Sequence, residues 1–186
     1  MKALFPLLFA LGAAACDAQA PEEGVQVRPM VQAAPARPLP PLTGRVVDQA
    51  QILTAEAEAK LVARLGALEE ATTDQLVVLT LPDLDGESIE KAGLRIGNGW
   101  GIGHKGVDNG VLLIVAPAER RARIEVGKGL EGLLTNEAAQ RIMDRQLVPS
   151  FGKGAYPEGI EAGVAAIDAV LRSDTRRPRP KAGAGE

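Results

Sequence analysis

The chain of 186 residues contains a single cysteine and a single histidine. One cysteine cannot form an internal disulfide, so the chain is not a disulfide-stabilised scaffold. One histidine excludes, within a single chain, a zinc site with several histidines and a catalytic pair of histidines. Aromatic residues make up only 3% of the chain and hydrophobic residues 46%, so we expect a core built from aliphatic side chains.

An excess of positive charge is also absent, because 21 Lys and Arg residues face 24 Asp and Glu residues, a formal net charge of -3. A nucleic-acid-binding protein usually carries a basic stripe, so the composition predicts no nucleic-acid partner. After the N-terminal region, no segment reaches the run of about 18 apolar residues that a transmembrane helix needs.

The N-terminus has the pattern of an export signal. Lys2 gives a short positive region, residues 3–15 form an uncharged apolar run, and small residues precede Cys16. The run is too short to span a bilayer but has the length of a signal peptide. We expect a lipoprotein signal over residues 1–15 and a lipidated Cys16 that anchors the protein on the periplasmic side of a membrane. The alternative is an ordinary cleaved signal and a secreted or periplasmic soluble protein.

Composition divides the rest of the chain into three parts. Residues 16–41 are rich in proline and alanine and predict an extended linker. Residues 173–186 are rich in proline, glycine and charge and predict a disordered tail. The folded domain is therefore expected over residues 42–172.

Hydrophobic periodicity within this domain predicts four helices and three strands. Helices are expected to begin near Thr54, Ser88, Thr135 and Pro157, and strands are expected over residues 75–81, 111–115 and 121–126. In the order α-β-α-β-β-α-α, a helical crossover implies parallel pairing of the first two strands, and a short turn implies an antiparallel hairpin. The pattern predicts an α/β protein with a small mixed sheet between helices, a three-layer α/β/α sandwich.

Two motifs that suggest familiar chemistry lie in the wrong context. Residues 101–106 read GIGHKG and match G-x-G-x-x-G, but they follow a predicted helix and precede a strand, the reverse of a nucleotide site. Asp83 and Asp85 follow a strand, as a phosphatase nucleophile does, but Asp85-Gly86 before a helix is more simply a turn. We predict no nucleotide ligand, and we interpret His104 as a solvent-exposed loop residue.

Topology brings a third set of polar residues together. Antiparallel pairing places the start of the second strand, after Asp108, at the same end of the sheet as residues 127–132 and the start of the third helix. Asp108, Glu131 and Asn136 can therefore converge as oxygen ligands for Ca²⁺ or Mg²⁺. The alternative, weighted equally on spacing alone, is that residues 108–109 make a turn and residues 136–137 complement the helix N-terminus.

Three segments of the chain closely resemble the TPM domain. They are VVDQAQIL at 46–53, GWGIGHKGVDNGVLLIVA at 99–116 and RIEVGKGLEGLLT at 123–135. The resemblance implies a Rossmann-like fold in an extracytoplasmic, often membrane-tethered protein. Plant relatives are tied to photosystem II repair and described as acid phosphatases, a nematode relative modulates an acetylcholine receptor, and some bacterial relatives bind divalent cations. Asn136 departs from the family pattern, in which Asp is common, and the C-terminal transmembrane helix of many bacterial members is missing.

Two functions follow as hypotheses. The first is a non-enzymatic module that binds a divalent cation and assists the assembly or repair of membrane or envelope proteins through an unidentified protein partner. The second is a metal-dependent phosphatase in which Asp108 holds the metal and Glu131 holds it or activates water. Binding is favoured over catalysis because no nucleophile–base pair and no phosphate-gripping cluster of basic residues can be named from the sequence.

Overall fold

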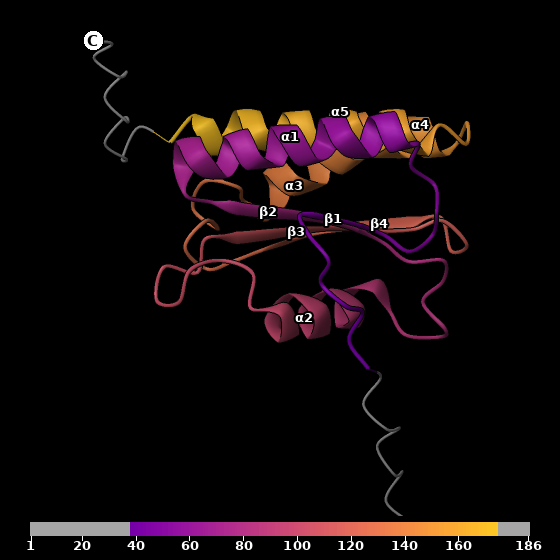
Figure 1. The fold of residues 1–186 in the computed structure, drawn as a ribbon, viewed down its shortest axis with the longest axis horizontal. Helices are drawn as coiled ribbons and strands as arrows, with labels where there is room; N and C mark the ends of the chain where they lie inside the picture. The colour runs from indigo at the N-terminus through magenta and orange to yellow at the C-terminus, as the bar shows by residue number, and fades with distance from the viewer. Residues whose placement is uncertain (1–37, 175–186) are drawn as a thin grey trace, which may run out of the picture. The chain divides into compact units, whose positions relative to one another are not determined.

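The computed structural model describes residues 38–174, and Figure 1 shows the arrangement of the elements. The predicted signal peptide, Cys16, the linker up to residue 37 and the tail from residue 175 lie outside the described residues. The elements are β1 (Val46–Asp48), α1 (Ala55–Thr72), β2 (Gln75–Thr80), α2 (Ile89–Trp100), β3 (Gly110–Ala116), β4 (Arg121–Val126), α3 (Asn136–Ile142), the π-helical turn η1 (Met143–Leu147), α4 (Val148–Phe151) and α5 (Tyr156–Arg172).

The four strands form one mixed sheet in the order β1-β2-β3-β4. β1 and β3 both pair parallel with β2, and β4 pairs antiparallel with β3, so the predicted parallel crossover and hairpin are both present. The sequence prediction omitted β1. Three residues are too short to display an alternating pattern, and this edge strand forms only because β2 supplies its hydrogen-bonding partner.

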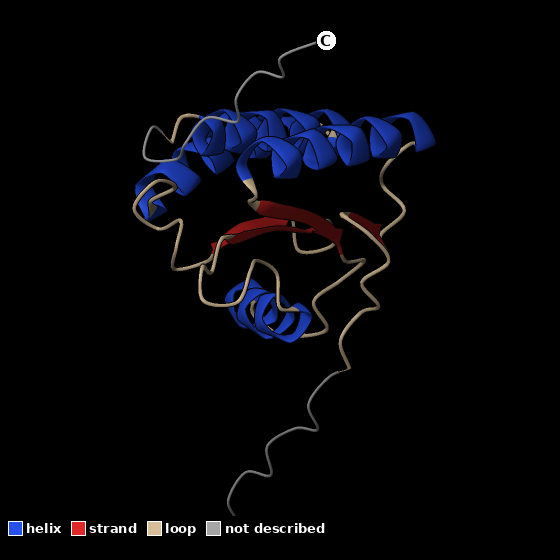
Figure 2. Ribbon diagram, turned by 60° about the vertical axis from the view of Figure 1, so that its left-hand side comes forward, coloured by secondary structure: helices blue, strands red, loops and turns tan. Residues whose placement is uncertain are grey.

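The sheet lies between two helical layers, as the α/β sandwich prediction required (Figure 2). One face packs α1, α3, η1 and α5 against alternate strand residues such as Leu113, while the other packs α2 against residues such as Leu112. Every residue of β3 is buried because both of its faces are covered. Burial on two sides is why β3 appears in the sequence as an unbroken apolar run.

The two crossovers differ in hand. The strand order advances in one direction from β1 to β3, yet α1 and α2 lie on opposite faces of the sheet. Two crossovers that advance in the same direction but pass over opposite faces of a sheet have opposite handedness. One of the two is therefore left-handed, although crossovers between parallel strands are almost always right-handed.

Polar residues cap the helices where the sequence predicted their starts. The side chains of Thr54, Ser88 and Thr135 accept hydrogen bonds from backbone N–H groups of α1, α2 and α3. The third predicted helix is interrupted, however, because α3 passes into the π-helical turn η1 and then into α4. Pro149 lies at the start of α4 and has no N–H to continue an α-helical ladder from the preceding turn.

Candidate functional site

The candidate site lies at the end of the sheet where β2 and β3 begin and β4 ends. The register pairs Gln75 with Gly110 and Val111 with Val126, so the loop before β3 lies next to the loop after β4. These two loops cover residues 101–109 and 127–135, and α3 begins directly after the second. This end of the sheet therefore collects the polar residues that the sequence placed there.

Two glycines allow the loops to approach each other at backbone distance. A Cβ atom on Gly129 would lie 2.0 Å from the Val107 carbonyl oxygen, and one on Gly127 would lie 2.2 Å from that of Asp108. The Gly129 N–H donates to the Asp108 carbonyl oxygen at 3.1 Å. The glycines after β4 thus have a packing role, because a side chain at either position would separate the loops.

Asp108 itself occupies a left-handed backbone conformation with φ of 53°. Its N–H donates to the His104 carbonyl oxygen at 2.9 Å, and its own carbonyl oxygen receives the Gly129 N–H. Both backbone groups of Asp108 are therefore committed to the two loops, while the residue is exposed.

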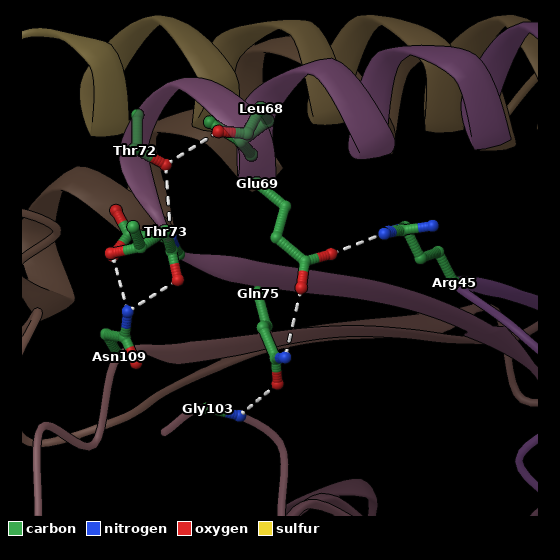
Figure 3. A network of polar contacts seen from close by, with 9 residues as sticks. Arg45, Leu68, Glu69, Thr72, Thr73, Gln75, Gly103 and Asn109 are labelled. Carbon is green, nitrogen blue, oxygen red and sulfur yellow. Dashed lines mark hydrogen bonds and ion pairs between the residues drawn. The ribbon is translucent and has the colours of Figure 1, made fainter. Parts of the chain in front are cut away.

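Asn109 is the buried anchor of this arrangement, with 2% exposure. Its Nδ2 donates to the Thr73 carbonyl oxygen at 2.7 Å and to Asp74 Oδ1 at 3.1 Å (Figure 3 draws the contact with Thr73). Its Oδ1 accepts from His104 N at 2.8 Å, and His104 Nδ1 lies 3.2 Å away. Because Nδ2 already serves two acceptors, Oδ1 faces His104, whose Nδ1 is then the donor. His104 is exposed as predicted, but Asn109 is the partner that the sequence did not reveal.

A second chain of contacts holds the glycine-rich loop from the other side (Figure 3). Gly103 N donates to Gln75 Oε1 at 2.8 Å, Gln75 Nε2 donates to Glu69 Oε1 at 3.1 Å, and Arg45 Nε pairs with Glu69 Oε2 at 2.7 Å. Partial burial acts to raise the pKa of Glu69, but the hydrogen bonds from Arg45 and Gln75 outweigh it and the pKa is lowered overall. The C-terminal part of α1 is thereby tied to the loop that carries Asp108.

The glycines of the G-x-G-x-x-G match serve this loop and its packing. Gly101 has φ of 62° and ends α2, and Gly106 has φ of 81°. A Cβ atom on Gly103 would lie 2.6 Å from Gly110 N. Left-handed turns and close backbone approach account for all three glycines without a bound phosphate.

The three predicted metal ligands are exposed at this end of the molecule. Asp108 precedes β3, Glu131 lies in the turn after the fully buried Leu130, and Asn136 is the first residue of α3. Within residues 38–174, no group of three or more His, Cys, Asp or Glu side chains is arranged to hold a metal ion. The adjoining backbone loops are observed, whereas the metal site itself remains a prediction.

The donor chemistry of these residues fits a hard cation. Two carboxylates and one amide offer only oxygen ligands, which Ca²⁺ and Mg²⁺ prefer, and a set this small leaves several positions to water. Sites with few charged ligands bind weakly, with dissociation constants on the order of 10⁻⁴–10⁻³ M in extracellular modules. Asp108, Glu131 and Asn136 are the residues that would hold such an ion.

The remaining carboxylates considered from the sequence lie elsewhere. Asp83 and Asp85 follow β2 and are exposed at the opposite end of the sheet. Asp85 and Gly86 both have positive φ, and Leu84 N donates to Glu119 Oε1 at 2.8 Å, so this segment is a turn tied to the β3–β4 hairpin.

Comparison with known proteins identifies relatives of this fold. The family model of the TPM domain matches residues 46–170. The N-terminal domain of a protein from P. gingivalis, solved in solution, is 33% identical with a TM-score of 0.67, and the match covers 73% of this chain and 86% of that one. No curated protein matches the chain.

Two further solution structures show the same fold at lower identity. The BA42 protein of the psychrophilic bacterium Bizionia argentinensis is 20% identical (TM-score 0.59, 69% of this chain and 86% of that one). The N-terminal domain of a Corynebacterium glutamicum protein is 13% identical (TM-score 0.57, 77% of this chain and 91% of that one). At these identities the likeness concerns the fold alone.

Proposed function

The chain belongs to the TPM domain family, and from this premise we propose that it is an exported, lipid-anchored module that binds a divalent cation and assists assembly or repair of envelope proteins. One observation carries the cation-binding part. The backbone of Asp108 is fixed by hydrogen bonds from both of its peptide groups, next to the loop that leads to Glu131, while the residue remains exposed. Exposed oxygen donors on adjoining loops, one of them on a backbone fixed by hydrogen bonds, suit Ca²⁺ or Mg²⁺.

The anchoring part rests on the N-terminal pattern and on Cys16. Among residues 38–174, no helix is long and apolar enough to cross a membrane. A lipid on Cys16 supplies an attachment that needs no such helix.

Amide chemical shifts test cation binding directly. The chain from residue 17 onward, which retains every described residue, is titrated with Ca²⁺ and separately with Mg²⁺. We expect shifts confined to residues 104–109 and 127–136 with millimolar affinity, and at least about tenfold weaker binding in Asp108→Asn. Asp83→Asn, at the opposite end of the sheet, is the matched control and leaves the affinity unchanged.

An assay of phosphate ester hydrolysis on the same samples distinguishes the phosphatase alternative from the binding role. Hydrolysis of a phosphate monoester that requires the cation and disappears in Asp108→Asn, but not in Asp83→Asn, supports catalysis by this site. Saturable shifts without turnover support the binding role. A cation concentration of about 10 mM lies well above the dissociation constants of the weakest protein sites of this kind. If neither cation produces shifts at that concentration, both proposals are wrong.

A further inference from the structure

The outer edge of β4 carries backbone groups that no neighbouring strand uses. β4 pairs only with β3, and the hydrogen bond from Gly127 N to Gly110 O at 2.8 Å fixes which of its residues face that partner. Successive residues of a strand direct their N–H and C=O groups to opposite edges. The odd-numbered residues of β4 therefore bond to β3, and Ala122, Ile124 and Val126 face outward. In the part of the chain that the structure describes, no other backbone segment bonds to these three residues.

A groove of about 360 Å³ lies along the first half of this edge. Ile89 of α2 lines it from one helical layer, Met143 and Phe151 line it from the other, and Ala122 of β4 lies between them. Because both layers contribute walls, the groove lies at the edge of the sheet. Val148 also lines the groove, and 57% of this apolar residue is exposed. The lining is therefore largely apolar and open to solvent.

Two arginines give the groove a positive rim. Arg120 and Arg121 line it at the β3–β4 turn, and neither forms an ion pair within residues 38–174. Glu90 is the one carboxylate in the lining. Hydrogen bonds from its own backbone N–H and from Ser88, and the positive charges of Arg123 and Arg121, lower its pKa. Two arginines and one glutamate leave the lining with a net positive charge, which favours an acidic ligand.

We propose that the outer edge of β4 and this groove bind an extended peptide segment of a partner protein, one that alternates apolar and acidic side chains. The segment adds a strand to the sheet by pairing with the backbone of Ala122, Ile124 and Val126. Its apolar side chains occupy the groove and its carboxylates meet Arg120 and Arg121. A peptide segment brings no helices of its own against the two helical layers, whereas a second copy of the chain would.

This inference goes beyond the proposed function and is separable from it. The groove lies at the β3–β4 turn, whereas Asp108 and Glu131 lie at the other end of β4. Peptide binding is measured with a chelator present, so failure of either proposal leaves the other untouched.

The test uses the chain from residue 17 onward and an acetylated, amidated octapeptide of alternating valine and glutamate. We expect saturable amide shifts at Ala122, Ile124 and Val126. Arg121→Glu is expected to weaken binding at least about tenfold, while Lys128→Glu, a charge reversal at the other end of β4, leaves it unchanged. Ala122→Pro removes one outward N–H, which an edge strand tolerates, and also weakens binding.

Two control peptides separate strand addition from simpler binding. Methylating alternate backbone nitrogens of the octapeptide removes its hydrogen bonds and is expected to abolish the shifts. Replacing its glutamates by lysines is expected to weaken binding as strongly as Arg121→Glu does. Equal binding of either control, or no shifts at millimolar octapeptide, overturns the proposal. Concentration-dependent shifts of the same amides without peptide, together with a doubled mass in sedimentation, also overturn it in favour of a second copy.

Discussion

At the scale of single residues, Asn109 explains how an exposed aspartate is held in place. Its amide joins the end of α1, through Thr73 and Asp74, to the loop that contains His104. Both polar atoms of its side chain are in use, and Asp74 is completely buried. A side chain that satisfies donors and acceptors at once in a buried position has few substitutes.

Replacing Asn109 with Asp tests this role. The change keeps the shape but removes two donors and places a second carboxylate next to Asp74, so we expect a loss of about 3 kcal/mol in the free energy of unfolding at pH 7. The introduced carboxyl should have a raised pKa in the folded state, because burial and a like charge both disfavour ionisation. A raised folded pKa gives stability that is lost as the pH rises, so the defect should shrink on acidification.

Urea unfolding at pH 7 and pH 5 measures both effects. The exposed Asn98 serves as control, since Asn98→Asp is expected to change stability by no more than about 0.5 kcal/mol. A defect of Asn109→Asp that grows at pH 5 would contradict the assigned contacts.

Glu69 makes a pH-dependent contribution with the opposite sign. Hydrogen bonds from Arg45 and Gln75 outweigh its partial burial and lower its folded pKa. Its stabilisation is therefore present above the unfolded pKa of about 4.3 and is lost as the pH falls through the folded value. The pair is partly exposed, so Glu69→Gln should cost no more than about 1 kcal/mol at pH 7 and progressively less below pH 4.

The free energy of unfolding of the wild type and of Glu69→Gln, measured between pH 7 and pH 3, tests this prediction. Glu70→Gln changes the neighbouring exposed residue and is expected to shift stability by no more than about 0.5 kcal/mol throughout. A Glu69→Gln deficit that does not diminish at low pH would refute the pairing.

At the scale of elements, glycines on α2 decide how closely it packs on β4. A Cβ atom on Gly93 would lie 2.5 Å from Glu125 Oε1 and 2.7 Å from its Cγ, and that side chain is also paired with Arg123. On Gly97 the nearest atom is Leu112 Cδ2 at 3.8 Å, an ordinary contact. One glycine is needed for packing and the other is not.

Alanine substitutions at these two positions should therefore have opposite effects. Gly93→Ala must displace Glu125 and is expected to destabilise the protein by about 1 kcal/mol or more. Gly97→Ala gains helix propensity without a clash and is expected to stabilise it by about 0.5–1 kcal/mol. Thermal unfolding of both variants measures the difference, and equal effects would show that α2 does not pack as described.

At the scale of the whole molecule, the folded unit extends beyond the stretch that the family model matches. Trp100 Nε1 donates to the Pro40 carbonyl oxygen at 2.8 Å, and the Leu39 side chain lies over Gly99. The predicted linker boundary at residue 41 remains a prediction, but Leu39 and Pro40 contact α2.

Starting the chain at residue 42 instead of 38 should therefore lower the free energy of unfolding by about 1 kcal/mol or more, through the lost hydrogen bond and apolar contact. Trp100→Phe in the longer chain removes the bond but keeps most of the ring, and should cost less than the truncation. Identical stability of the two chains would mean that these residues contribute nothing to the fold.

Anchoring is tested by Cys16→Ser in cells. Cys16 lies outside the described residues, and its lipidation remains a prediction from the sequence. The variant is expected to move from the membrane to the soluble fraction, because no acyl chain can then be attached. If Cys16→Ser stays with the membranes, an attachment other than this lipid must hold it there.

The sequence by itself determined the α/β sandwich, the parallel crossover, the hairpin and the helix caps, because these depend on local periodicity and on polar residues a few positions apart. It also placed the loops around Asp108 and residues 127–132 side by side, because antiparallel pairing fixes which ends of two strands meet. Only the tertiary structure decided the three-residue strand β1, the break between α3 and α4, and the partners of Asn109 and Gln75. Those features depend on contacts between residues far apart in the chain, and a single sequence records no such distances.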